Sequence, residues 1–371
     1  MISSRSRDVA MVTECLADNM EPRIGMRGFF AAFLLFVAMT VFNLGCESLQ
    51  KFEYVQPKMG TGFRMVLYAR DKALADRAAK AAFERVDQLN AIFSDYDSNS
   101  ELSKLGQLTN DGPMSKPVAV SPDMWRILQR AYAASEESDG AFDITVGPFV
   151  RLWRRSRDLH ELPTTQRLEQ TRVSVGWQAM RLFPQTHSVL LLKPHMRLDV
   201  GGIAKGYTAM ECVALIRGFG IRSAMMGAAG DLTVGDPPPG RPYWRVTVQS
   251  LADPEKSDGY VKLRNASIST SGDTQRFIII DGQRYSHIID PRTGLGLTHR
   301  IGCTVISPDG TTSDWLCKPP CVLGPERGLH LIDQTPGAAG RVVTLDELGG
   351  EQIYESARWR DYVLNDGQSP D

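Results

Sequence analysis

The sequence predicts one large α+β body, because helix-like and strand-like segments mix without a regular alternation and no repeat of fixed period appears. The chain has 371 residues, of which 42% are hydrophobic and 23% charged, a composition typical of a folded globular protein. The 42 basic residues nearly balance the 43 acidic ones, so the net charge is −1. A protein without a strong positive field is not expected to bind nucleic acid.

An uncharged stretch at residues 28–45 predicts an N-terminal targeting segment, since it follows Arg23 and Arg27 and ends at Cys46. Two interpretations stay open. The segment is either a lipoprotein signal cleaved before a lipidated Cys46, or an uncleaved membrane anchor, because its length is near the lower limit of about 17 residues for a spanning helix. Met26 is a candidate for the true start. Both interpretations place the domain at the inner membrane, on the periplasmic or extracytoplasmic side.

The chain is therefore expected to consist of four segments in order. These are residues 1–45 as the signal or anchor, 46–58 as a tether, 59–364 as the folded domain and 365–371 as a polar tail.

Two amphipathic helices are predicted in the first half of the domain. From Ala73 onward apolar residues recur at helical spacing as far as Phe93, after a strand-like segment at 63–69. A second helix begins with Ser121 as its N-cap and Pro122 in its first turn, and it stops at Asp139 and Gly140. The later part of the chain is rich in predicted strands, at 189–192, 197–200, 244–248, 260–263, 277–280 and 301–306. An Asp281-Gly282 turn predicts a hairpin after the fifth of these.

The segment 198–207, LDVGGIAKGY, predicts a strand, a glycine-rich turn and then a helix. Glycines let backbone N–H groups approach an anion, the helix N-terminus adds partial positive charge, and Lys205 supplies a point charge for a phosphate. A purely structural turn is an equally good interpretation of this segment alone.

Three further segments are candidates for chemistry. His287 stands at the end of a predicted strand and is a candidate general base, although a packing role is the commoner one for a lone histidine. Residues 266–273, ASISTSGD, could line a tight cleft or form a plain polar strand and turn. Asp314 opens an apolar run, which also fits a carboxylate at a helix N-terminus.

Taken together, these residues closely resemble the ApbE family of FAD:protein FMN transferases. The resemblance runs from about Met59 to Thr344. Matching stretches are 59–61, 93–96 with 100–102, 140–143 leading into 145–148, 198–207, 229–231, 269–273, 287–294 and 322–326.

The resemblance implies an ApbE-like, T-fold-related fold in which FAD lies in a cleft beside Mg²⁺. A threonine or serine hydroxyl of a target protein attacks the FMN phosphorus, AMP leaves, and FMN stays attached through a phosphoester. The usual acceptors are exported flavoprotein subunits of sodium-pumping and related redox complexes.

The resemblance also assigns roles to residues of this chain. His287 becomes the base, and Tyr96 and Phe142 make sense as aromatic surfaces for a planar ring. The FAD contacts would be Met59, Tyr96, Ala141, Phe142, Asp143, Asp199, Lys205 and Ile288. The metal would be held by the Gly202 carbonyl, by Asp314 and by the residue at position 318.

At that last position the sequence departs from the family, which has a threonine ligand there on a continuous helix. Here Lys318 is followed by Pro319 and Pro320. A protonated lysine cannot ligate a metal, and prolines inside a helix break the turn. Two other functions therefore stay open beside FMN transfer: an exported FAD-binding protein without activity, and a hydrolase that converts FAD to FMN and AMP.

Overall fold

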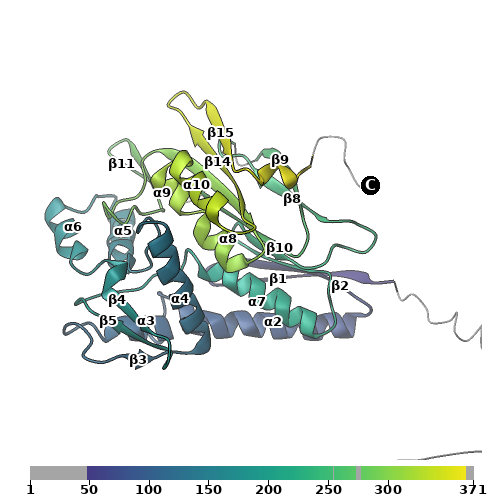
Figure 1. Ribbon diagram of the computed structural model, residues 1–371, viewed down its shortest axis with the longest axis horizontal. Helices are drawn as coiled ribbons and strands as arrows, with labels where there is room; N and C mark the ends of the chain where they lie inside the picture. Colours follow the sequence, from purple (N-terminus) through teal and green to yellow (C-terminus); the bar gives the residue numbers. More distant parts are fainter. Residues whose placement is uncertain (1–47, 254, 273–276, 365–371) are drawn as a thin grey trace, which may run out of the picture. The chain divides into compact units, whose positions relative to one another are not determined.

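The computed structural model describes residues 48–253, 255–272 and 277–364, which form a body that starts at Leu49 (Figure 1). The expected signal or anchor and the polar tail lie outside the described residues. Within those residues, no helix is long and apolar enough to cross a membrane.

Eight strands of the described chain form one antiparallel sheet, in the order β1-β2-β6-β7-β10-β13-β14-β15. Their bounds are β1 Gln50–Lys58, β2 Thr61–Ala69, β6 Ala224–Ala228, β7 Asp231–Val234, β10 Ala266–Gly272, β13 Arg300–Ser307, β14 Ala339–Leu345 and β15 Glu351–Glu355. The expected tether at 46–58 is thus wrong. Residues 50–58 are an edge strand in register with β2, so the fold begins before Met59.

The two faces of this sheet are covered differently, as the alternation along β2 shows. Phe63, Met65 and Leu67 are buried in a core shared with helices, whereas Val66 is buried on the opposite face. That second face is covered by a small sheet, whose Trp244 packs in the same cluster as Val66. The strands of this sheet, in order, are β16 Val363–Leu364, β9 Ser257–Leu263 and β8 Trp244–Gln249. Side chains of a strand point alternately to its two faces. Apolar residues at alternate and at intervening positions of β2 therefore pack into the two cores on opposite faces of the sheet.

Helices cover the first face (Figure 1). The predicted helix from Ala73 is confirmed as α2, Lys72–Phe93, with every residue of its apolar stripe buried. The second predicted helix is confirmed as α4, Pro122–Glu137, where the Ser121 hydroxyl accepts from Met124 N–H at 3.3 Å. The other helices are α3 Glu101–Gln107, α5 Gly147–Leu159, α6 Thr165–Arg172, α7 Ala204–Gly218, α8 Gly310–Leu316, α9 Pro319–Leu323 and α10 Pro325–Gln334, with short 3₁₀ turns η1 Trp177–Ala179 and η2 Trp359–Asp361.

The remaining strands complete the small sheets: β3 Val118–Ala119, β4 Met180–Phe183, β5 Ser188–Leu191, β11 Phe277–Ile280 and β12 Gln283–Ser286. The β11–β12 hairpin is confirmed. The strand predicted at 197–200 is wrong. Among the described residues, the only ladder contact of this segment is the single bridge from Arg197 to Val146, and Asp199 N–H donates to the Ile144 carbonyl at 2.7 Å.

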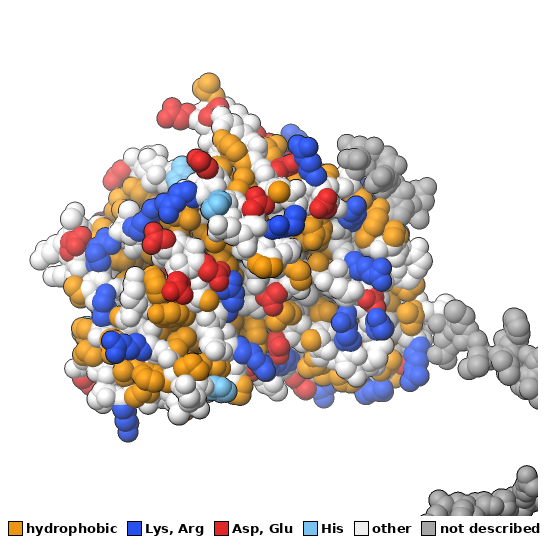
Figure 2. All heavy atoms as spheres, in the orientation of Figure 1, with side chains coloured by type: hydrophobic (Ala, Val, Ile, Leu, Met, Phe, Trp, Pro, Cys, Tyr) orange, Lys and Arg blue, Asp and Glu red, His pale blue; other side chains and the backbone are white. Residues whose placement is uncertain are grey.

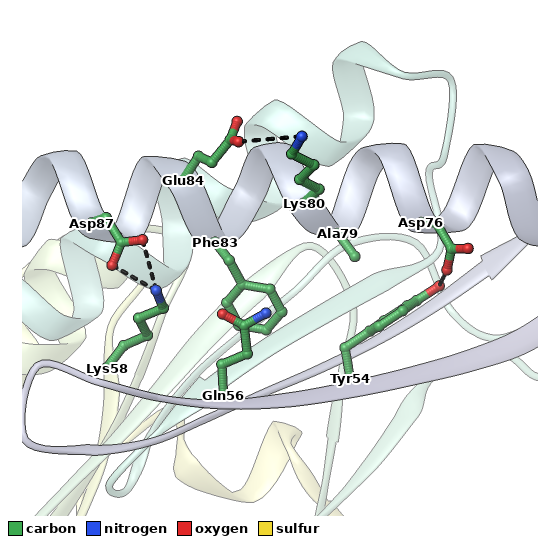
Figure 3. Close-up of a pocket in the computed structure, with 9 residues that line it drawn as sticks. All are labelled: Tyr54, Gln56, Lys58, Asp76, Ala79, Lys80, Phe83, Glu84 and Asp87. Carbon is green, nitrogen blue, oxygen red and sulfur yellow. Dashed lines mark hydrogen bonds and ion pairs between the residues drawn. The ribbon is translucent and has the colours of Figure 1, made fainter.

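Strand β1 is held to α2 by polar contacts (Figure 3). The Tyr54 hydroxyl donates to Asp76 Oδ1 at 2.8 Å, and Lys58 Nζ donates to Asp87 Oδ2 at 2.6 Å. Phe83 of α2 lies between these two contacts. The hollow there has a volume of about 250 Å³, and none of the site residues predicted from the sequence lines it. We therefore interpret the polar contacts around this hollow as ones that hold the edge strand β1 in place.

Helices α7 and α8 touch backbone to backbone. A Cβ atom at Gly206 would lie 2.0 Å from the Gly310 carbonyl oxygen, and one at Gly310 would lie 2.5 Å from the Gly206 oxygen. Both positions therefore require glycine for steric reasons. At this crossing Gly206 N–H donates to Asp314 Oδ2 at 2.8 Å.

The Gly206→Ala substitution should lower the free energy of unfolding by about 1–3 kcal/mol, because the added methyl group forces α7 and α8 apart. Urea unfolding followed by circular dichroism measures this. The matched control is Gly218→Ala in the same helix, where a Cβ meets nothing within 4 Å. It should be neutral or stabilising. Equal effects of the two substitutions would contradict the steric argument.

Candidate active site

A cavity of about 1230 Å³ lies in the described body. All the site residues predicted from the sequence line it except Asp314, which is fully buried behind its wall. Every stretch that carried the family resemblance contributes at least one lining residue, for example Met59, Tyr96, Phe142, Lys205, Asp231, Thr270, His287 and Val322. The fold thus brings segments that are distant in the sequence to one place. The volume exceeds the roughly 300–1,000 Å³ common for small-ligand sites.

Acidic and basic side chains are interspersed over the face of the molecule shown in Figure 2. The net charge of −1 also leaves no strong overall field, so the residues of the cavity itself set the charge that a ligand meets.

One region of the cavity carries an exposed aromatic ring. Tyr96 follows α2 and is 79% exposed, and the Arg154 guanidinium of α5 lies 4.0 Å from its ring centre. Arg154 is fixed by Asp95 at 2.5 Å and lies 3.8 Å from Asp199. Phe142 is buried to 6% exposure and packs edge-on against Trp315, with ring centres 5.9 Å apart. Both rings have the chemistry to contact a planar heterocycle.

Asp143 lines the cavity, but its carboxylate is used to hold the chain. It accepts from Thr145 N–H and the Thr145 hydroxyl at 2.7 Å each, and from Trp177 N–H at 3.1 Å. Burial raises the pKa of Asp143 and outweighs these hydrogen bonds, which lower it. In this structure Asp143 therefore positions the loop of Ala141 and Phe142.

Asp199 stands where the extended segment enters the glycine turn, and its Oδ1 accepts from Gly201 N–H at 2.8 Å. Burial and the nearby Asp95 raise the pKa of Asp199, against the opposite effects of Gly201, Arg154 and Lys205. The predicted helix after the turn is confirmed as α7, although the strand predicted before it is not.

Two half-buried lysines and two buried aspartates form a charged cluster at the floor of the cavity. Lys205 Nζ lies 3.1 Å from Asp231 Oδ2 and 4.0 Å from Asp314 Oδ1, and it donates to the Gly201 carbonyl at 2.9 Å. Lys318 Nζ donates to Asp314 twice, at Oδ1 and at the main-chain carbonyl. We call Lys205, Asp231, Asp314 and Lys318 the charge cluster.

Both lysines of the charge cluster stabilise the ionised form of Asp314. Burial raises the pKa of Asp314, but Lys205 and Lys318 outweigh this and the net shift is downward. Burial lowers the pKa of Lys318, but Asp314 and its neighbours raise it above its ordinary value. For Asp231, burial and Asp314 raise the pKa. We conclude that the Lys318 ammonium and the Asp314 carboxylate are both ionised near neutral pH.

The residues expected to hold Mg²⁺ do not fit that ion in this arrangement. Asp314 Oδ2 is taken by Gly206 N–H and Oδ1 by the Lys318 ammonium, which has no lone pair to offer a metal. Among the described residues, no group of three or more His, Cys, Asp or Glu side chains is placed to hold a metal ion.

The helix break predicted at the prolines is confirmed. Helix α8 ends at Leu316, and α9 starts at Pro319 directly after Lys318. One interpretation of the sequence placed Asp314 at a helix N-terminus. This is wrong, because Asp314 lies inside α8. Asp309 caps that helix by accepting from Thr312 N–H at 2.7 Å, and Asp314 lies a turn later with its side chain buried toward α7.

His287 is exposed and follows β12 directly, as its sequence position predicts. The next residue, Ile288, is buried, and its N–H donates to the Ser286 hydroxyl at 3.1 Å. The turn that follows requires Gly294, whose φ is 79° and where a Cβ would lie 2.6 Å from the Phe149 ring. The histidine is thus presented to the cavity by a tightly specified turn.

Sequence reasoning missed three residues that shape the cavity. Asp95 and Asp231 lie inside stretches that match the family, so the sequence could have identified them as candidate site residues. Arg154 lies in α5 outside those stretches, and only the contacts of the folded chain reveal it.

Comparison with known proteins gives consistent matches. The model of the ApbE family matches residues 59–342. An FAD:protein FMN transferase of Vibrio cholerae is 28% identical and aligns with 89% of this chain and 98% of its own. A Klebsiella pneumoniae protein of the same name is 30% identical over 76% of this chain and 86% of its own. The structure titled flavin transferase ApbE from Vibrio cholerae superposes with a TM-score of 0.75 at 25% identity, covering 85% of this chain and all of that one.

Proposed function

The chain belongs to the ApbE family, and we propose that it is an FAD:protein FMN transferase, which moves FMN from FAD to a hydroxyl group of a target flavoprotein. One observation carries this proposal: residues from all the matching stretches line one cavity.

FAD would lie along the cavity with its flavin ring against Tyr96 and Phe142. Met59, Ala141 and Ile288 supply apolar contacts, and all five residues line the cavity. Asp199 lies beside the glycine turn, where Lys205 is the point charge for the pyrophosphate. Asp143 supports this site indirectly, through the loop it holds.

In the proposed reaction, a threonine or serine hydroxyl oxygen of the acceptor attacks the FMN phosphorus. The bond from that phosphorus to the AMP phosphate oxygen breaks, and AMP leaves with the bonding electron pair. His287 accepts the proton of the attacking hydroxyl and can later release it to solvent. The product carries FMN through a phosphoester. Most of the rate enhancement would come from alignment and charge stabilisation in the cavity.

The family resemblance also implies Mg²⁺ beside FAD, where the ion would neutralise pyrophosphate charge. In this arrangement the Asp314 oxygens are engaged by Gly206 and Lys318, so they are not open to the ion.

We place the domain on the periplasmic or extracytoplasmic side of the inner membrane, held there by a lipid on Cys46 or by an uncleaved anchor. The support is the uncharged stretch at 28–45 that ends at Cys46. The acceptor would then be an exported or membrane flavoprotein with a Thr or Ser target. Mass measurement of the mature N-terminus distinguishes the two forms of attachment.

Incubation of the purified protein with FAD and a threonine-bearing acceptor should add one FMN to the acceptor and release one AMP. Intact-mass measurement of the acceptor and chromatography of the nucleotides check this. Free FMN and AMP without a labelled acceptor would show a hydrolase. FAD that is bound and stays intact would contradict both enzymatic functions and leave a binding protein.

The His287→Ala variant should keep its FAD affinity but lose FMN transfer by about 10²-fold or more, because a positioned base contributes roughly 10²–10⁴-fold. Flavin fluorescence measures the affinity and acceptor mass measures the transfer rate. The control is His330→Ala, an exposed histidine of α10 that does not line the cavity. Transfer at the unsubstituted rate would remove His287 from the mechanism.

A further inference from the structure

We infer that the ammonium group of Lys318 replaces a divalent cation in this site, so that FAD binding and FMN transfer in this protein need no metal ion. The inference rests on the proposed function. It goes beyond that function by assigning the positive charge of the site to a side chain of the protein, at the position where the resemblance implies a metal ligand.

The Lys318 side chain lies at the wall of the cavity. Its Cε and Cδ lie 3.5 and 3.8 Å from the point where a Cβ of Gly202 would stand. The lysine therefore runs along the glycine turn and ends on Asp314. It lies among the residues that the resemblance assigns to the metal and carries its charge at the cavity wall.

Backbone hydrogen bonds on both sides of Lys318 fix its position. Lys318 N–H donates to the Trp315 carbonyl at 3.1 Å, and its own carbonyl accepts from Cys321 N–H at 3.0 Å. Pro319 and Pro320 occupy the first positions of α9, where a missing N–H costs no helix hydrogen bond. The prolines thus start a new helix and present the lysine, so the departure from the family pattern is one coherent arrangement.

The Lys318 ammonium group has one N–H donor that is not used by Asp314. Lys318 Nζ has three N–H donors, and two of them serve Asp314. Its other contact is the Cys317 sulfur at 3.4 Å, a weak acceptor. A phosphate oxygen that reached the cavity floor would be a much stronger partner for this donor.

The charges of the charge cluster balance one another. The two lysines and two aspartates of the charge cluster sum to zero when all are ionised. A divalent ion in place of the Lys318 ammonium would give the same site one more positive charge. We therefore expect the fixed ammonium to support FAD binding, with less charge stabilisation than a divalent ion offers. It also blocks that ion by occupying Asp314 Oδ1.

The test begins with the unsubstituted protein. FAD affinity, measured by flavin fluorescence, should differ by less than about twofold between excess EDTA and excess Mg²⁺, because an ion that is not bound with FAD cannot shift the equilibrium. FMN transfer to the acceptor should proceed in both buffers. An increase in FAD affinity or transfer of tenfold or more with Mg²⁺ would overturn the inference and leave the proposed function intact.

Substitutions then test the lysine itself. Lys318→Met keeps the length of the side chain but removes its charge, and FAD affinity should fall on the order of tenfold, since the hydrogen bond from a charged donor to the phosphate is lost. Lys80→Met, at an exposed lysine of α2 outside the cavity, is the control. Lys318→Thr should make FAD binding depend on Mg²⁺. Unchanged, metal-independent affinity in both Lys318 variants would overturn the inference.

A direct metal measurement protects the test against variants that fail to fold. Electron paramagnetic resonance of Mn²⁺ with the unsubstituted protein and FAD should show only the free ion, whereas tight Mn²⁺ binding that FAD strengthens would contradict the inference. If no transfer occurs in either buffer, the proposed function fails. FAD affinity with and without Mg²⁺ then decides on Lys318 alone.

Discussion

The buried carboxylate of Asp314 is the constraint on which the site depends. A fully buried charge is costly unless hydrogen bonds and an opposite charge compensate it. Gly206 N–H and the Lys318 ammonium supply that compensation. The first requires α7 and α8 to touch at Gly206 and Gly310, and the second requires the chain to break after α8. The contact between α7 and α8 and the position of Lys318 both satisfy this one carboxylate.

The cavity combines two kinds of recognition on one scaffold. Aromatic and apolar residues, Tyr96 and Phe142 among them, offer surfaces for a flat ring, and the charge cluster offers a locally charged floor. A net charge of −1 for the whole chain means that an anionic ligand must be held by such local groups and not by a general field. His287, on the turn after β12, lines the same cavity without belonging to the charge cluster.

Much of this could be predicted from the sequence, because local patterns encode it. The apolar stripe of α2, the Ser121 cap and the break at Pro319 are confirmed, since spacing and steric rules decide them. The rest depended on long-range contacts. The segment 197–200 reads as a strand, yet it pairs with a loop, and residues 50–58 belong to the main sheet although they precede the family match. No local pattern shows that Asp143 accepts from Trp177 N–H or that Arg154 covers Tyr96.

A structure of the protein with FAD in the presence of Mg²⁺ tests the central claim most directly. We expect Lys318 Nζ to stay on Asp314 and to lie about 2.7–3.2 Å from a pyrophosphate oxygen, with no ion between them. An octahedral ion bound to Asp314 and the pyrophosphate, with Lys318 turned away from the carboxylate, would contradict it.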